Sequence, residues 1–229
     1  MAITLARAAI GRLFYQRCFY LFLVLLALIV GVPFIEPTAL GRFTVNMMAI
    51  AVIIAAVAAI GRTVVSFVVA LLLAVPAVLF HWLGVTSADA HWSLLSWSFG
   101  AALYATTLAF LLRYVFQHDV MTVDRLFGAA AAYLLIGVLW GYLYAIVGYL
   151  YPGSFGSSGA AIVMTAHDYV YFSFTVLTST GFGDITPLLR QARSLCVMQQ
   201  LVGTLFLAIL IARLAGVYPP PDRKAQPVE

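Results

Sequence analysis

The chain has 229 residues, of which 64% are hydrophobic and only 9% are charged, and its mean hydropathy is +1.06. Soluble domains carry about a quarter charged residues, so this composition excludes an ordinary soluble protein and indicates a membrane protein. The formal net charge of +4 then reflects membrane topology and not a nucleic-acid partner. The two cysteines, Cys18 and Cys196, lie far apart in sequence, which argues against a disulfide framework or a cysteine metal site.

Six apolar segments are long enough to cross a bilayer as helices, at about 1.5 Å per residue against roughly 30 Å of hydrocarbon. We expect these spans at residues 18–35, 43–60, 63–85, 92–112, 126–151 and 194–212. The first has no clear small-residue cleavage site and further spans follow it, so it is predicted to be a retained helix and not a signal peptide. Residues 1–17 carry three arginines and are expected either to lie along the membrane surface or simply to anchor the first span.

The region between the last two spans, residues 152–193, has a different character. It opens with a loop rich in Gly and Ser at 152–159 and continues into an apolar stretch at 169–178 that is too short to span. This pattern predicts a re-entrant helix, which enters the membrane and turns back where protein or water surrounds it.

A glycine–aromatic–glycine motif follows that short helix, in the sequence Thr178-Ser179-Thr180-Gly181-Phe182-Gly183-Asp184. Two glycines around one aromatic residue allow backbone conformations that place successive carbonyl oxygens on one side of the chain. Four such strands in a ring can replace the hydration shell of a potassium ion. The triplet alone is weak in a chain this rich in Gly and Phe, but its position behind a re-entrant helix and between two spans predicts a selectivity filter.

The basic residues are distributed unevenly over the loops. If both termini lie on one side, that side holds nine of them: Arg7, Arg12, Arg17, Arg62, Arg113, Arg125, Arg213, Arg223 and Lys224. The opposite side holds only Arg42, Arg190 and Arg193. The positive-inside rule therefore predicts that both termini are cytoplasmic and that the re-entrant loop enters from the outside.

Residues 122–217 resemble the two-helix pore module of potassium channels, of the bacterial type with additional N-terminal spans. The family's filter pattern Thr-Thr-Val-Gly-Tyr-Gly-Asp corresponds to residues 178–184. Further similarity lies in Tyr133-Leu134-Leu135-Ile136-Gly137, Asp184-Ile185-Thr186-Pro187, Leu201-Val202-Gly203 and Ile211-Ala212-Arg213-Leu214. The first 120 residues resemble the family only in general layout.

The resemblance implies an all-α membrane protein with six transmembrane helices, a re-entrant pore helix and a filter, assembled as a homotetramer around a central pore. The implied domains are an N-terminal segment at 1–17, a four-span membrane domain at 18–120, the pore domain at 121–217 and a short cytoplasmic tail at 218–229. The implied location is a bacterial cytoplasmic membrane.

The same resemblance assigns roles to individual residues. Potassium ions would bind in a filter formed by Thr178, Ser179, Thr180, Gly181, Phe182 and Gly183, and no other metal or cofactor is expected. Asp184 would sit at the outer mouth, where it attracts cations and bonds behind the filter. Gly203 matches the inner-helix hinge of the family. A helical face with spacings of three or four residues, which would line the inner cavity or contact lipid and neighbouring helices, contains Gln200, Thr204, Leu207 and Ile211.

Several positions depart from the family pattern. Ser179 lacks the methyl group of the usual Thr, Thr180 places a hydroxyl where an apolar side chain is normal, and Phe182 lacks the Tyr hydroxyl. The pore-helix Glu of many relatives corresponds to about Thr175. These departures loosen the support of the filter, so a poorly selective cation pore stands as an alternative to a potassium-selective one.

A conventional voltage sensor needs arginines at every third position of one span. The fourth span, 92–112, contains none, and Arg113 stands only at its end. The sequence therefore predicts a channel that is not gated by such a sensor, with the first four spans as a scaffold around the pore.

The other polar residues are expected to have structural roles. His81 and His91, beside tryptophans, are expected to be interfacial anchors in preference to a metal pair. Asp168 is predicted to cap the re-entrant helix at its N-terminus. The pairs His118-Asp119 and Asp124-Arg125 are expected in a solvated loop with local ion pairs.

Small residues in the fifth span, Gly137, Gly141 and Gly148, are expected to allow close approach of another helix. No nucleophile–base pair for an intramembrane hydrolase is recognisable, so an enzyme is not predicted.

The function that the sequence favours is passive conduction of K⁺ through a homotetramer in a lipid membrane. Three alternatives remain: a non-selective monovalent cation channel that also passes Na⁺, a subunit of a potassium-uptake transporter, and a non-conducting scaffold. The transporters of that class carry four pore loops in one chain, whereas this chain has one.

Overall fold

The computed structural model describes residues 17–31, 34–35, 38–60, 64–87, 90–117 and 122–217. These residues form seven helices, namely α2 (Arg17–Gly31), α3 (Ala39–Ile60), α4 (Val64–Ser87), α5 (Ala90–Val115), α6 (Val123–Leu150), α7 (Ala166–Leu177) and α8 (Arg190–Val217). They also form three short strands, β1 (Phe155–Ser157), β2 (Ala160–Ala161) and β3 (Thr186–Pro187). The expected membrane-surface segment before Arg17, the pair His118-Asp119 and the tail 218–229 lie outside the described residues.

Four of these helices are long and apolar enough to cross a membrane, at residues 65–87, 90–115, 123–150 and 190–215 of the described chain. They confirm the third to sixth predicted spans. The apolar stretches Cys18–Gly31 and Met47–Ala58 are shorter, so the first two spans stay predictions. The chain is thus a mostly helical integral membrane protein.

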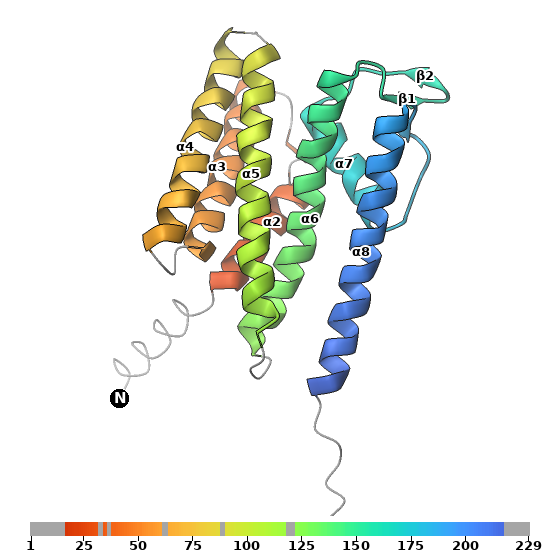
Figure 1. The fold of residues 1–229 in the computed structure, drawn as a ribbon. Coiled ribbons are helices and arrows are strands. Elements are labelled where there is room, and N and C mark those ends of the chain that lie inside the picture. The colour runs from red at the N-terminus through yellow and green to blue at the C-terminus, as the bar shows by residue number, and fades with distance from the viewer. Residues whose placement is uncertain are drawn as a thin grey trace, which may run out of the picture.

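Helix α6 occupies the centre of the fold. It contacts α2 and α5 on one side and α7 and α8 on the other, while α3 and α4 pack farther out beside α5 (Figure 1). Apolar side chains lie all around α6, as expected for a helix that is enclosed by other helices. The fully buried Leu135 and Ile136 belong to the main core cluster of the described residues.

The glycines of α6 lie against the short helix α7, which confirms their predicted role. A Cβ atom at Gly137 would collide with the ring of Phe174, one at Gly141 would crowd Val170, and one at Gly148 would collide with Tyr169. Larger residues at these positions would therefore push α7 away from α6.

The strands form a small antiparallel sheet in the order β2-β1-β3, and β3 contacts α8. Strand β1 pairs Phe155 with Pro187 and Gly156 with Thr186, so it joins the loop before α7 to the segment just after the glycine–aromatic–glycine motif. The amide of Leu188 also donates to the carbonyl of Ser154, at 2.8 Å. The sheet therefore fixes the two ends of the segment between β1 and β3 to each other.

The prediction that Asp124 and Arg125 lie in a solvated loop was wrong. Both side chains are buried, at 8% and 6% exposure, in the first turn of α6. The Asp124 carboxylate accepts a hydrogen bond from the backbone amide of Cys18 at 3.2 Å and one from the Tyr114 hydroxyl at 2.8 Å. The Arg125 guanidinium lies over the Tyr114 ring, at 5.3 Å from its centroid. Tertiary contacts from two other helices, which the local sequence does not reveal, bury this charged pair.

Replacement of Asp124 tests this joint between α2, α5 and α6. We expect Asp124→Ala to destabilise the protein by about 2 kcal/mol, because the Tyr114 hydroxyl and the Cys18 amide lose their acceptor. Tyr114→Phe removes only one of the two bonds and should have a smaller effect. The measurement is the thermal unfolding midpoint in detergent, and a wild-type midpoint for Asp124→Ala would contradict the assignment.

Candidate functional site: the segment after helix α7

Helix α7 is twelve residues long, or about 18 Å, which is too short to cross a membrane. It begins after Thr165, whose hydroxyl accepts the amide of Asp168 at 3.3 Å while the Asp168 carboxylate accepts the amide of Thr165 at 2.8 Å. Asp168 is therefore the third helical residue of a capping box and not the N-cap, which corrects the prediction by three positions.

After α7 the backbone alternates in handedness. Ser179, Gly181 and Gly183 have positive φ values of 56°, 55° and 79°, whereas no positive φ occurs at Thr180 or Phe182. Alternation of left-handed and right-handed residues turns successive peptide planes so that their carbonyl oxygens can share one side of the strand. Left-handed backbone costs a glycine little, but it costs a residue with a Cβ atom such as Ser179 about 1–2 kcal/mol.

The amides of this segment are held by the end of α7. The amides of Thr180 and Gly181 both donate to the carbonyl of Thr175, at 2.9 and 3.2 Å, and the amide of Ser179 donates to the carbonyl of Val176 at 3.0 Å. No hydrogen bond within the described residues uses the carbonyl oxygens of residues 179–182. The first three amides of the segment are thus bound, while its carbonyl oxygens are available as acceptors.

The hydroxyl groups next to the strand form a chain. Thr178 donates from Oγ1 to the carbonyl of Phe174 at 2.7 Å, and the Oγ1 atoms of Thr178 and Thr180 lie 2.7 Å apart. Because the proton of Thr178 is used on Phe174, Thr180 is the donor in the second bond. The hydroxyl at Thr180, where the family has an apolar side chain, therefore has its hydrogen-bond partner within the same chain.

The carboxylate of Asp184 accepts a hydrogen bond from the Tyr171 hydroxyl, at 2.8 Å. This bond, together with some desolvation and the negative charge nearby, raises the pKa of the Tyr171 phenol above its ordinary value. The hydroxyl of Thr175, at the position of the family's Glu, instead donates to the carbonyl of Phe172 at 2.8 Å. Asp184 is therefore bound to α7 through Tyr171, which lies four residues before Thr175.

A buried polar network between α6, α7 and α8 was not predicted from the sequence. Gln199 of α8 is fully buried, accepts from the Tyr144 hydroxyl at 2.6 Å, and donates to both the carbonyl and the hydroxyl of Ser173. Ser173 in turn donates to the carbonyl of Gly137 at 2.6 Å. This network joins α6, α7 and α8. The signal available in the sequence was a glutamine inside an otherwise apolar span, which must find partners in such surroundings.

The residues predicted on the inner face of α8 are exposed in the single chain. Gln200, Thr204, Leu207 and Ile211 all lie on its free surface, and the Gln200 amide donates to the Ser179 hydroxyl at 3.4 Å. Gly203 is buried where α8 crosses the end of α7, and a Cβ atom there would meet Leu177 at 2.7 Å. The close contact with Leu177 accounts for a glycine at this position. Helix α8 is continuous through Gly203, so the role of this residue as a hinge stays a prediction.

Of the two histidines singled out in the sequence, His91 contacts a tyrosine of the next helix. The Nδ1 atom of His91 lies 3.0 Å from the Tyr149 hydroxyl, so this residue links α5 to α6 at the end of the helices that lies near the sheet. Among the described residues, no group of three or more His, Cys, Asp and Glu side chains is placed to hold a metal ion.

Helices α6 and α8 thus enclose a short helix and a segment with positive φ at alternate residues. Residues 128–218 match the family model described as ion channel, and this part of the chain is similar to the two-helix ion channel domain of potassium channels. No curated protein and no solved structure matches the chain.

Gln199 and its neighbour Gln200 provide a matched pair of variants. Gln199→Ala leaves the Tyr144 hydroxyl without its acceptor in an apolar region and removes the link from α8 to Ser173, so we expect a loss of about 2 kcal/mol in stability. Gln200→Ala, at an exposed position, should leave the unfolding midpoint unchanged. Equal midpoints for the two variants in the same detergent would contradict the structural role of Gln199.

The bond between Tyr171 and Asp184 can be tested by a double-mutant cycle. Tyr171→Phe and Asp184→Ala should each shorten the open time of the channel, because each frees the end of the segment after Gly183 from α7. The double variant should be no worse than either single variant, since both remove the same bond. Single-channel recordings measure the open time, and strictly additive effects would show that the two residues act independently.

Proposed function

We propose that this chain is one subunit of a homotetrameric potassium channel that conducts K⁺ passively across a membrane. The observation that carries the proposal is the segment 179–183, which has left-handed residues at alternate positions. The amides of Ser179, Thr180 and Gly181 are bound to α7, and the carbonyls of residues 179–182 take part in no hydrogen bond within the described residues. Such carbonyls replace water around a dehydrated potassium ion, and K⁺ would bind in the filter formed by residues 178–183.

The proposed tetramer is supported by the surfaces that one subunit leaves uncovered. A single strand cannot surround an ion, so at least several copies are needed around one axis. The ring of Phe182 is 70% exposed, although it sits in the middle of the filter strand. Ile211 on the free face of α8 is 65% exposed. In the tetramer, neighbouring subunits would cover Phe182, and the exposed face of α8 would line the inner cavity.

Potassium selectivity is favoured over general cation conduction by how the strand is held. The hydrogen bond between Thr178 and Thr180, the two amides on the Thr175 carbonyl and the bond from Tyr171 to Asp184 stiffen the segment within one subunit. A stiff ring of carbonyls resists collapse onto the smaller Na⁺, whereas a loose ring accepts both ions. A non-selective cation channel is the alternative, because Ser179 and Thr180 depart from the filter pattern of the family.

The remaining parts of the proposal concern the surroundings of the pore. Helices α2 to α5 form a scaffold beside the pore domain, and α5 carries Arg113 only in its last turn, so it lacks the arginine ladder of a voltage sensor. Both termini face the cytoplasm, which places the filter mouth outside, in a bacterial cytoplasmic membrane.

The reversal potential under opposed K⁺ and Na⁺ gradients tests the proposal. For the purified protein in planar bilayers, we expect a reversal potential close to the potassium equilibrium potential. Gly181→Ala should abolish the current, because Gly181 has a φ of 55° and any other L-residue is strained there. No atom lies within 4 Å of the added Cβ in the subunit, so the loss would come from the backbone and not from a clash inside the chain.

Each result bears on a different part of the proposal. A reversal potential near zero would indicate a non-selective cation channel. A current that persists in Gly181→Ala would show that ions do not pass through this strand. The absence of current from folded wild-type tetramers would favour the non-conducting scaffold.

A further inference from the structure

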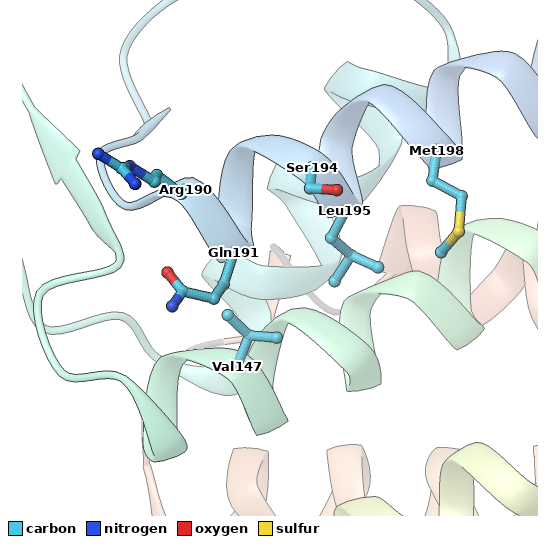
Figure 2. Close-up of a pocket in the computed structure, with 6 residues that line it drawn as sticks. All are labelled: Val147, Arg190, Gln191, Ser194, Leu195 and Met198. Atoms are coloured by element: carbon cyan, nitrogen blue, oxygen red, sulfur yellow. The ribbon is translucent and has the colours of Figure 1, made fainter.

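Helix α8 has two different sides close to the filter segment. Toward α6, a cavity of about 480 Å³ is lined by Val147 of α6 and by Arg190, Gln191, Ser194, Leu195 and Met198 of α8 (Figure 2). Gln200 does not line this cavity. It lies on the free surface of α8, and its side-chain amide donates a hydrogen bond to the Ser179 hydroxyl at 3.4 Å. This bond joins α8 directly to the segment 179–183.

The Ser179 hydroxyl is held differently from the two hydroxyls beside it. Thr178 bonds to the carbonyl of Phe174, and the hydroxyls of Thr178 and Thr180 bond to each other. Within the described residues, the Ser179 hydroxyl bonds neither to α7 nor to its own segment, and its partner is Gln200. The hydroxyl at the α7 end of the segment is therefore held by α8 alone.

The backbone at Ser179 explains why this hydroxyl needs a partner. Ser179 has a φ of 56°, a value at which a β-branched residue such as Thr is a rare outlier. Serine fits this backbone better, but it lacks the methyl group that restricts the χ1 angle of Thr. Its hydroxyl can therefore turn between staggered positions unless a hydrogen bond selects one of them. The amide of Gln200 supplies that bond.

The bond from Gln200 leaves the Ser179 oxygen able to bind a cation. A hydroxyl oxygen has two lone pairs, and the amide of Gln200 occupies one of them. The other lone pair can face an ion. When the position of the oxygen is fixed, the size of a ring of such oxygens is fixed as well. A ring of fixed size favours K⁺, whereas hydroxyls that turn freely can close in around the smaller Na⁺.

We propose that Gln200 positions the Ser179 hydroxyl and thereby raises the preference for K⁺ over Na⁺ at the α7 end of the filter. Gln200 acts through Ser179 and does not itself touch the ion, so it is a positioning residue. The inference rests on the proposed function, because it requires the segment 179–183 to be the ion path. It assigns to α8 a part of the selectivity that the filter motif alone would assign to residue 179.

The permeability ratio of Na⁺ to K⁺, obtained from reversal potentials of the purified protein in planar bilayers, tests this role. Gln200→Met keeps the length of the side chain but has no donor. We expect it to raise the ratio about fivefold, which corresponds to the loss of one neutral hydrogen bond. Gln200→Asn keeps the amide but is one methylene shorter, so it should behave like Gln200→Met. Ser194→Ala, on the side of α8 that lines the cavity, is the control and should keep the wild-type ratio.

A double-mutant cycle shows whether Gln200 acts through Ser179. In a Ser179→Ala background, Gln200→Met should raise the ratio no further, because the acceptor is already missing. A rise of the same size in that background would overturn the inference, as would a wild-type ratio for Gln200→Met or Gln200→Asn. The unfolding midpoints of the Gln200 variants should equal that of the wild type, since Gln200 is exposed, so a change in the ratio would not reflect a loss of folding.

Failure of the proposed function gives a different result. A wild-type reversal potential near zero contradicts potassium selectivity itself, and the inference with it. Calorimetric titration of the purified protein with K⁺ and with Na⁺ compares the two affinities without a current. The ratio of K⁺ affinity to Na⁺ affinity should be lower in Gln200→Met than in the wild type. Equal ratios would overturn the role of Gln200 even in protein that conducts no ions.

Discussion

The side-chain amide of Gln199 is the interaction on which the pore region most depends. Helix α7 is only twelve residues long and cannot hold its own position in a membrane. Gln199 joins it to α8 through Ser173 and to α6 through Tyr144, while Ser173 bonds to the carbonyl of Gly137. In an apolar surrounding, these groups have no water to replace a lost partner, so the network specifies one arrangement of the three helices.

The position of α7 in turn determines the strand that follows it. The carbonyl of Thr175 receives two amides from the strand, and the last turn of α7 receives the hydroxyl of Thr178. These bonds offset the cost of the left-handed backbone at Ser179, which is about 1–2 kcal/mol for a residue with a Cβ atom. Strain of this kind persists only where the surroundings impose it. The alternating strand is therefore a consequence of the helix packing, and the two glycines make it less costly.

The sequence predicted the parts of this arrangement that follow from local patterns. Hydropathy located the third to sixth spans, and the short apolar stretch at 169–178 located α7 within three residues at its start and one at its end. The sixth span was expected at residue 194 but α8 begins at Arg190, because a polar first turn resembles a loop in composition. Burial of Asp124 and Arg125 could not be predicted, since it depends on Cys18 and Tyr114 from other helices. The partner of Asp184 was missed for a similar reason. The hydroxyl of Tyr171 binds Asp184, whereas the family pattern pointed to the side chain at position 175.

The helices before the pore domain contact it at both ends, and this limits how α8 can move. Near the sheet, Tyr149 of α6 bonds to His91 of α5. At the opposite end, the guanidinium of Arg213 in α8 donates to the carbonyl of Gln117 and lies 5.3 Å from the centroid of the Phe116 ring, just beyond α5. An outward movement of the last turns of α8 must break these contacts, whereas a bend near Gly203 must also disturb its close packing on Leu177. The energy of any movement of α8 therefore includes contacts with the residues just after α5. The segment that follows α5 thus contributes to the position of α8.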